Sequence, residues 1–269
     1  MSAVKNQCFK KKNLCDIFNV MINKFSLFKA VFGRFSPKLV ILPVIILFSC
    51  LFLMSQTLYD PMQQQKAELI KLLEKNFNIT DKAIITALQS VNREDFLPQE
   101  MKKYAYIDIS LPIDNSNVII SYSDLMKAVT SLKNSSREKA LVIGRNSDFT
   151  TAILSFLYKQ VYQIEFNTAS GNKDGNKDDA SARGKYSNVI TVFSKDYNYF
   201  STYGPFDLVF VNSSITEFKS NYADLLTQNG EAIFALADIY GFNMLHKATK
   251  TGLSYSITTL GEAMFPSSN

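Results

Sequence analysis

The chain has 269 residues, 46% of them hydrophobic, which allows one folded domain with a full core and a tail. Its net charge of +5 is concentrated at the start: residues 1–38 carry eight lysines and arginines against one acidic residue, and the remainder is slightly acidic. This distribution argues against a nucleic-acid partner, because such a domain needs a basic face to neutralise phosphates.

An apolar run, LVILPVIILFSCLFLM, follows the basic tail at residues 39–54. With its neighbours it reaches the length of a membrane-spanning helix, about 17–25 residues. The pattern predicts a cytoplasmic tail at 1–38, a transmembrane anchor at 39–55 and an extracytoplasmic domain at 62–269, because positive flanks stay inside. Two alternatives remain open: a buried core helix, and a lipid on Cys50 within LFSC, which resembles a bacterial lipobox.

Cysteine and histidine offer little chemistry to the domain. The three cysteines, Cys8, Cys15 and Cys50, all precede it, so we expect no disulfide, no cysteine nucleophile and no metal site there. The chain has a single histidine, so a Ser-His-Asp or Cys-His mechanism lacks support. That residue, His246, lies on an apolar stretch expected to be helical and is expected to be a surface or core residue and not a catalyst.

Two helices are expected first along the chain. Residues 62–77 place apolar side chains at helical spacing, and Thr80 is the expected N-cap of a second helix. From residue 123 onward, helical and strand patterns alternate, which predicts an α/β fold with an open, mostly parallel sheet and helices on both faces. The expected strands are 140–144, 160–165, 188–193, 206–212 and 231–236, and the expected helices are 123–133, 149–158, 215–227 and 239–249.

The turn after strand 140–144 is the first candidate for a ligand site. Ligands of such sheets bind at the carboxyl ends of central strands, which places Gly144, Glu165 and the turn 194–197 around one crevice. Gly144 opens the segment GRNSD ahead of a helix, as in loops that hold a ligand at a helix N-terminus. Residues 167–185 contain a tandem GNKD and almost no apolar residue, so they are expected to form a flexible surface loop.

Seven short motifs between residues 66 and 266 resemble those of the protein-L-isoaspartate O-methyltransferases, which use S-adenosylmethionine (SAM). They are similar to the family patterns V-x-R-E-x-F-V-P, A-Y-x-D-x-x-L-P-I, T-I-S-x-P, A-P-F-D-x-I, P-G-G and F-V-P. In this chain they read SVNREDFLP at 90–98, YAYID at 104–108, LPI at 111–113, IISYS at 119–123, GPFDLV at 204–209, QNG at 228–230 and MFP at 264–266.

The resemblance implies a Rossmann-like SAM-methyltransferase fold and methyl transfer from SAM to isoaspartyl carboxylates of damaged proteins or peptides, a protein-repair reaction. It gives Ser121 the role of orienting the acceptor carboxylate, while the sequence alone equally makes Ser121 the N-cap of helix 123–133, and both roles can hold. For the cofactor it implies Gly144, Ser147, Glu165 and Asp196.

Departures from the family pattern concentrate at the cofactor loop. Val142 stands where an acidic residue is usual, Asn146 and Asp148 stand where glycines are usual, and Arg145 adds bulk and positive charge. Ile119 and Ser123 stand where the family has threonine and proline. Two hypotheses follow: an isoaspartyl methyltransferase, or a catalytically inactive, membrane-anchored interaction domain that keeps the fold.

Overall fold

The structure is a computed structural model that describes residues 60–113, 118–144, 146–166, 185–194, 197–238 and 243–266. The predicted anchor at 39–55, the basic tail, Cys50, Asp196 and nearly all of the 167–185 loop lie outside these residues, so those predictions stay predictions. Within the described residues, no helix is both long and apolar enough to cross a membrane.

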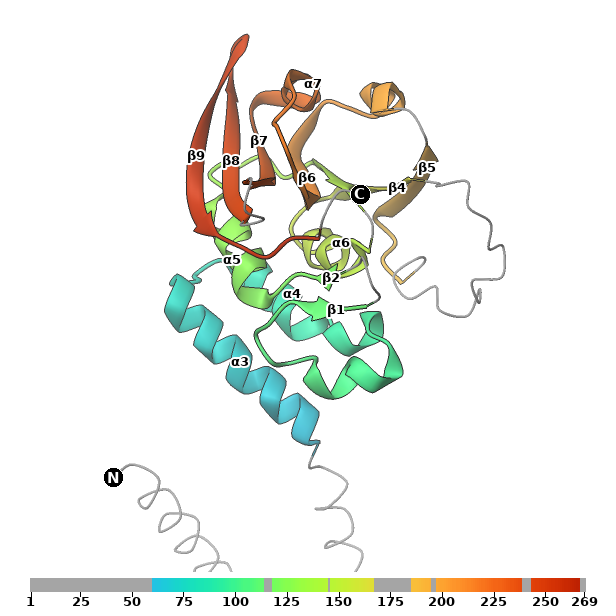
Figure 1. The fold of residues 1–269 in the computed structure, drawn as a ribbon, viewed down its shortest axis with the longest axis vertical. Helices are drawn as coiled ribbons and strands as arrows, with labels where there is room; N and C mark the ends of the chain where they lie inside the picture. Colours follow the sequence, from blue (N-terminus) through green and yellow to red (C-terminus); the bar gives the residue numbers. More distant parts are fainter. Residues whose placement is uncertain are drawn as a thin grey trace, which may run out of the picture. The chain divides into compact units, whose positions relative to one another are not determined.

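A seven-stranded sheet forms the centre of the domain, in the order β5-β4-β3-β6-β7-β8-β9 (Figure 1). The first five strands in this order are parallel, and the last two are antiparallel. Their bounds are β3 Lys139–Ile143, β4 Gln160–Phe166, β5 Val189–Ser194, β6 Phe206–Ile215, β7 Leu226–Ala237, β8 Asn243–Thr251 and β9 Ser254–Glu262. All five predicted strands and the mostly parallel sheet are confirmed.

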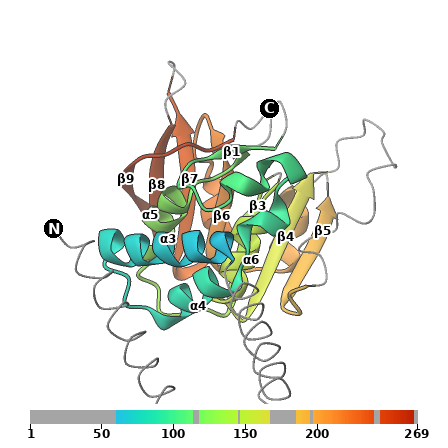
Figure 2. The same cartoon turned by 90° about the horizontal axis from the view of Figure 1, so that it is seen from below.

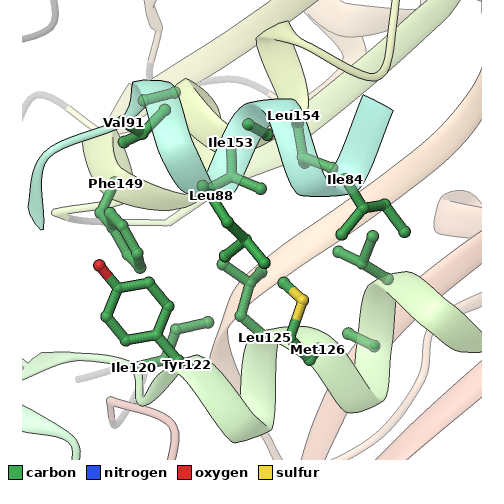
Figure 3. Close-up of a cluster of buried hydrophobic side chains, with 14 of the residues drawn as sticks. Ile84, Leu88, Val91, Ile120, Tyr122, Leu125, Met126, Phe149, Ile153 and Leu154 are labelled. Carbon is green, nitrogen blue, oxygen red and sulfur yellow. The ribbon is translucent and has the colours of Figure 1, made fainter. Parts of the chain in front are cut away.

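The two faces of the sheet have separate cores. Ala140 and Val142 of β3 point to one face, which is covered by α3 (Pro61–Phe77), α4 (Lys82–Ser90), α5 (Tyr122–Ser131) and α6 (Asp148–Ser155). Figure 2 shows α3, α4 and α5 in front of the strands, and Figure 3 shows side chains of α4, α5 and α6 directed toward one another. Leu141 and Ile143 point to the opposite face, toward η4 (Tyr197–Thr202) and α7 (Ser220–Asp224). Burial on both faces explains why these strands are continuous apolar runs, and the prediction of helices on both faces is confirmed.

One predicted helix is wrong. Residues 239–249 were expected to be helical, but 243–251 form strand β8, which pairs antiparallel with β7 so that His246 lies opposite Phe234. The hairpin partner β9 has no counterpart among the expected strands. The apolar β7 would otherwise be an open sheet edge, and pairing with it outweighs the weak helical preference of the segment.

Two further expectations need correction. The helix expected at 215–227 shrinks to the five residues of α7, because β6 extends to Ile215 and β7 begins at Leu226. The N-cap of α4 is Asp81 and not Thr80, because the Asp81 carboxylate accepts a hydrogen bond from the Ala83 N–H at 2.8 Å. The helices at 62–77, 123–133 and 149–158 are confirmed within a few residues.

Candidate functional site

Arg93 organises the segment that leads to Ser121. It lies in η1 (Arg93–Phe96), is fully buried, and donates to five backbone carbonyls between residues 105 and 120. The three shortest bonds reach Ile109 at 3.0 Å, Ile119 at 3.1 Å and Ile120 at 2.9 Å. Burial lowers the pKa of Arg93 to about 10, so the guanidinium keeps its charge at neutral pH.

Aromatic rings surround the same guanidinium. Its central carbon lies 5.2 Å from the ring centre of Tyr122 and 5.5 Å from that of Phe149, and the two rings meet edge to face at 5.3 Å. Tyr122 belongs to α5 and Phe149 to α6, so Arg93 couples the starts of both helices. Burial raises the pKa of the Tyr122 phenol, which excludes this hydroxyl as a base at neutral pH.

Ser121 is buried at the N-terminus of α5 and performs the predicted capping role. Its Oγ accepts from the Asp124 N–H at 3.0 Å, and its own N–H donates to Ser110 Oγ at 3.1 Å. Ser110 Oγ donates in turn to the Met264 carbonyl at 3.3 Å, and the Met264 N–H donates to Asp124 at 3.0 Å. Three segments far apart in the sequence thus meet at Ser121, and the role of Ser110 could not be inferred from its local sequence.

Asp108 lies next to this cluster and binds the first turn of α5. Its carboxylate accepts from the Ser123 N–H at 2.9 Å and from the Ser123 hydroxyl. A proline at position 123 could make neither bond, so this departure from the family pattern supplies an attachment between the 105–113 segment and α5. The helix dipole favours a carboxylate at this position.

Two residues of the loop after β3, Gly144 and Asn146, have positive φ angles. Gly144 has a φ of +135°, and a Cβ there would lie 3.2 Å from the backbone of Asn212 on β6, so only glycine fits without strain. Asn146 has a φ of +48°, a conformation that asparagine tolerates better than most other residues. Asparagine in place of the family's glycine at position 146 therefore costs little backbone strain.

Ser147 holds the loop together. It is fully buried, its Oγ donates to the Gly144 carbonyl at 3.1 Å, and it accepts from Gln163 Nε2 at 3.2 Å. Gln163 lies on β4 and also donates to Asp148 Oδ1 at 2.7 Å. The resemblance implies a cofactor role for Ser147, but its hydroxyl is hydrogen-bonded within the loop. The contacts of Gln163 with the loop could not be predicted, because nothing in its local sequence indicates them.

A cleft of about 450 Å³ opens between this loop and the segment after η1. Phe96, Ile113, Ile119 and Phe149 give it apolar walls. Its polar lining includes Asp95, Lys102, Asn146 and Asp148. The size and mixed lining are those of a small-molecule site.

Two predicted cofactor residues remain, Glu165 and Asp196. β4 runs parallel to β3 with Ile164 opposite Ile143, so the backbone of Glu165 lies beside Gly144. The side chain of Glu165 and all of Asp196 fall outside the described residues. In the part of the chain that the structure describes, no group of acidic, histidine or cysteine side chains could hold a metal ion.

Comparison with known proteins points in one direction. The model of the protein-L-isoaspartate(D-aspartate) O-methyltransferase family matches residues 63–267. A protein-L-isoaspartate O-methyltransferase of Parvibaculum lavamentivorans is 28% identical over 200 residues, which cover 73% of this chain and 88% of the relative. Protein-L-isoaspartate O-methyltransferase 2 of Shewanella sediminis is 24% identical over 188 residues, 70% of this chain and 76% of the relative. A Plasmodium falciparum crystal structure, assigned as a protein-L-isoaspartate O-methyltransferase in complex with S-adenosyl-L-homocysteine, has a TM-score of 0.59 at 19% identity and covers 74% of this chain and 96% of its own.

Proposed function

Since this chain belongs to the protein-L-isoaspartate(D-aspartate) O-methyltransferase family, we propose that it transfers a methyl group from SAM to isoaspartyl carboxylates of damaged proteins. The observation that carries the proposal is the adjacency of a small-molecule cleft and the Ser121 cluster. Ile119 lines the cleft two residues before Ser121, and Phe149, which also lines it, contacts Tyr122 directly after Ser121.

The residues of the cleft fit SAM. Gly144 directly follows β3 at the edge of the sheet where ligands of such folds bind, and the aromatic and aliphatic walls suit an adenine ring. The carboxylates of Asp95 and Asp148 suit a ligand that carries positive charge. When bound, SAM supplies a methyl group activated by its sulfonium.

The chain's own residues orient the acceptor and exclude water. The N-terminus of α5 attracts a carboxylate, and the Ser121 hydroxyl can donate to one while its Oγ still caps the helix. An acceptor carboxylate is already an anion at neutral pH, so the reaction needs no base, and none of the groups around Ser121 has to take a proton. Positioning and desolvation then supply most of the rate.

The proposal also includes the location of the protein. The basic tail and the apolar run at 39–55 support a membrane anchor with residues 1–38 in the cytoplasm and the domain on the far side. SAM is made in the cytoplasm, so in this orientation the domain lies on the opposite side of the membrane from the source of its cofactor. A reporter fused after residue 269 that reports a cytoplasmic location would contradict the orientation.

The test uses the full chain in mild detergent. We expect SAM to bind in calorimetric titration, to stabilise the fold by about 2.7 kcal/mol at a hundredfold excess over Kd, and to methylate an isoaspartyl peptide. The matched aspartyl peptide is the control and should stay unmodified. Glu165→Ala should abolish the stabilisation by SAM.

Ser121→Gly tests the acceptor role. Glycine is a tolerated N-cap, so this variant should remain folded, keep SAM binding and lose methyl transfer at least tenfold. Asp81→Gly also places glycine at a helix N-cap, that of α4, where the residue does not line the cleft, and it should leave transfer unchanged. A cooperative melt without SAM binding by the wild type would contradict the proposal and leave an inactive methyltransferase fold.

A further inference from the structure

Asp148 and Gln163 form a pair across the cofactor loop. Asp148 is the first residue of α6 and lines the cleft, and its Oδ1 accepts from Gln163 Nε2 at 2.7 Å. Gln163 is 1% exposed and lies in the middle of β4, between apolar neighbours that are also buried. A buried amide in a central strand is costly unless it is bonded. Both bonds from its nitrogen go to the loop, one to Asp148 and one to Ser147, while its Oε1 has no hydrogen-bond partner among the described residues.

This pair fixes the direction of the Asp148 carboxylate. The amide of Gln163 holds Oδ1, and among the described residues no donor to Oδ2 is present. Oδ2 is therefore available to a ligand in the cleft. A carboxylate held in place by a buried partner loses little side-chain entropy when it binds, which favours a built site over an incidental surface charge.

The other charges around the cleft leave the role of cation partner to Asp148. Asp95 is engaged by Lys185, whose Nζ lies 2.6 Å from Asp95 Oδ2. Val142, which stands at the position where the family pattern has an acid, is fully buried in the core between sheet and helices and offers no charge. Within the described part of the chain, Asp148 is the cleft carboxylate without an ion-pair partner.

We infer that Asp148 binds the α-ammonium group of SAM and that Gln163 is the positioning residue for this contact. SAM carries two cations, but only the ammonium has N–H donors, and a carboxylate oxygen aligned by a hydrogen bond binds a donor best. The glycine-to-aspartate change in the loop then replaces the charge that Val142 does not provide. This inference rests on the proposed SAM binding and names a ligand residue that the sequence motifs do not.

The experiment compares three ligands by calorimetric titration of the full chain in detergent: SAM, S-adenosylhomocysteine and 5′-methylthioadenosine. The first two carry the ammonium, the first alone carries the sulfonium, and the third has neither. Asp148→Asn keeps the shape and the bond from Gln163 but removes the charge. We expect it to weaken SAM and S-adenosylhomocysteine by the same factor, about tenfold or more, and to leave methylthioadenosine within twofold.

Two further variants separate positioning from general damage. Gln163→Met should give a smaller loss with the same ligand pattern, because the carboxylate remains but is no longer held. Glu138→Gln removes a carboxylate that pairs with Lys159 and does not line the cleft, and it should change none of the three affinities more than twofold. A purely structural role of Gln163 would weaken all three ligands together.

The titrations distinguish a failure of the Asp148 assignment from a failure of the proposed function. Unchanged SAM affinity in Asp148→Asn, a loss confined to SAM, or an equal loss for all three ligands would overturn the inference while the proposed function stands. Absence of binding by the wild type, with a cooperative melt, would overturn the proposed function as well.

Discussion

Replacing Arg93 by methionine tests whether one buried guanidinium holds the acceptor side of the site together. The substitution keeps much of the side-chain length and removes every donor. Three carbonyls within 3.1 Å of Nη2 then lose their partner, and those of Ile119 and Ile120 belong to residues at most 2% exposed, where water cannot replace it. An unsatisfied buried carbonyl costs about 1–3 kcal/mol, so two of them predict a loss of roughly 2–6 kcal/mol in unfolding free energy.

Urea unfolding followed by far-UV circular dichroism measures this loss, because the chain has no tryptophan. Arg137→Met is the matched control: Arg137 pairs with Asp81 at 2.5 Å, but both side chains are about one-third exposed, and such pairs contribute at most about 1 kcal/mol. A loss for Arg93→Met no larger than that of the control would refute the reasoning. Arg93→Lys should recover part of the loss, because three donors replace five.

Three other changes test the remaining features. Gly144→Ala should reduce SAM affinity at least tenfold and lower the melting temperature, because a Cβ at φ +135° lies 3.2 Å from the Asn212 backbone; unchanged titration and melting curves would contradict this. Lys247→Met should cost about 3–5 kcal/mol in urea unfolding, because it leaves the buried Glu231 carboxylate, 2.9 Å from Lys247 Nζ, without its cation. Burial lowers the pKa of His246, the single histidine, so the unfolded chain takes up its proton at higher pH and stability should fall as pH drops below about 6.5; His246→Gln should remove this dependence.

The parallel half of the sheet could be predicted because its strands are buried on both faces and read as continuous apolar runs between turns. The antiparallel half could not. The segment NMLHKAT of β8 contains apolar residues at positions that suit a helix as well as a strand, and β9 is almost entirely exposed, so neither carries a pattern of its own. Their structure is decided by the open edge of β7, which a local reading of the sequence does not contain.

At the site, residues that act through backbone geometry could be anticipated, and residues that act across the fold could not. Gly144 follows a strand and precedes a helix, and Ser121 precedes a helix, so their positions alone indicate their roles. Arg93 lies within a recognised motif, yet its five carbonyl partners are between 12 and 27 residues away. Ser110 and Gln163 likewise have partners that only the folded chain brings together.

The same distinction bears on whether the cofactor loop is a working one. Read one residue at a time, the side chains at 146 and 148 look like losses of glycine. In the structure Asn146 adopts the left-handed backbone that the turn needs, and Asp148 is bonded to Gln163, fifteen residues later on the neighbouring strand. Random decay of a loop would leave a cleft carboxylate without such a partner, and a glutamine in a central strand would be a cost without one. A buried amide nitrogen that donates both to Ser147 and to the Asp148 carboxylate at the edge of the cleft favours a loop rebuilt to hold a ligand over one that is being lost.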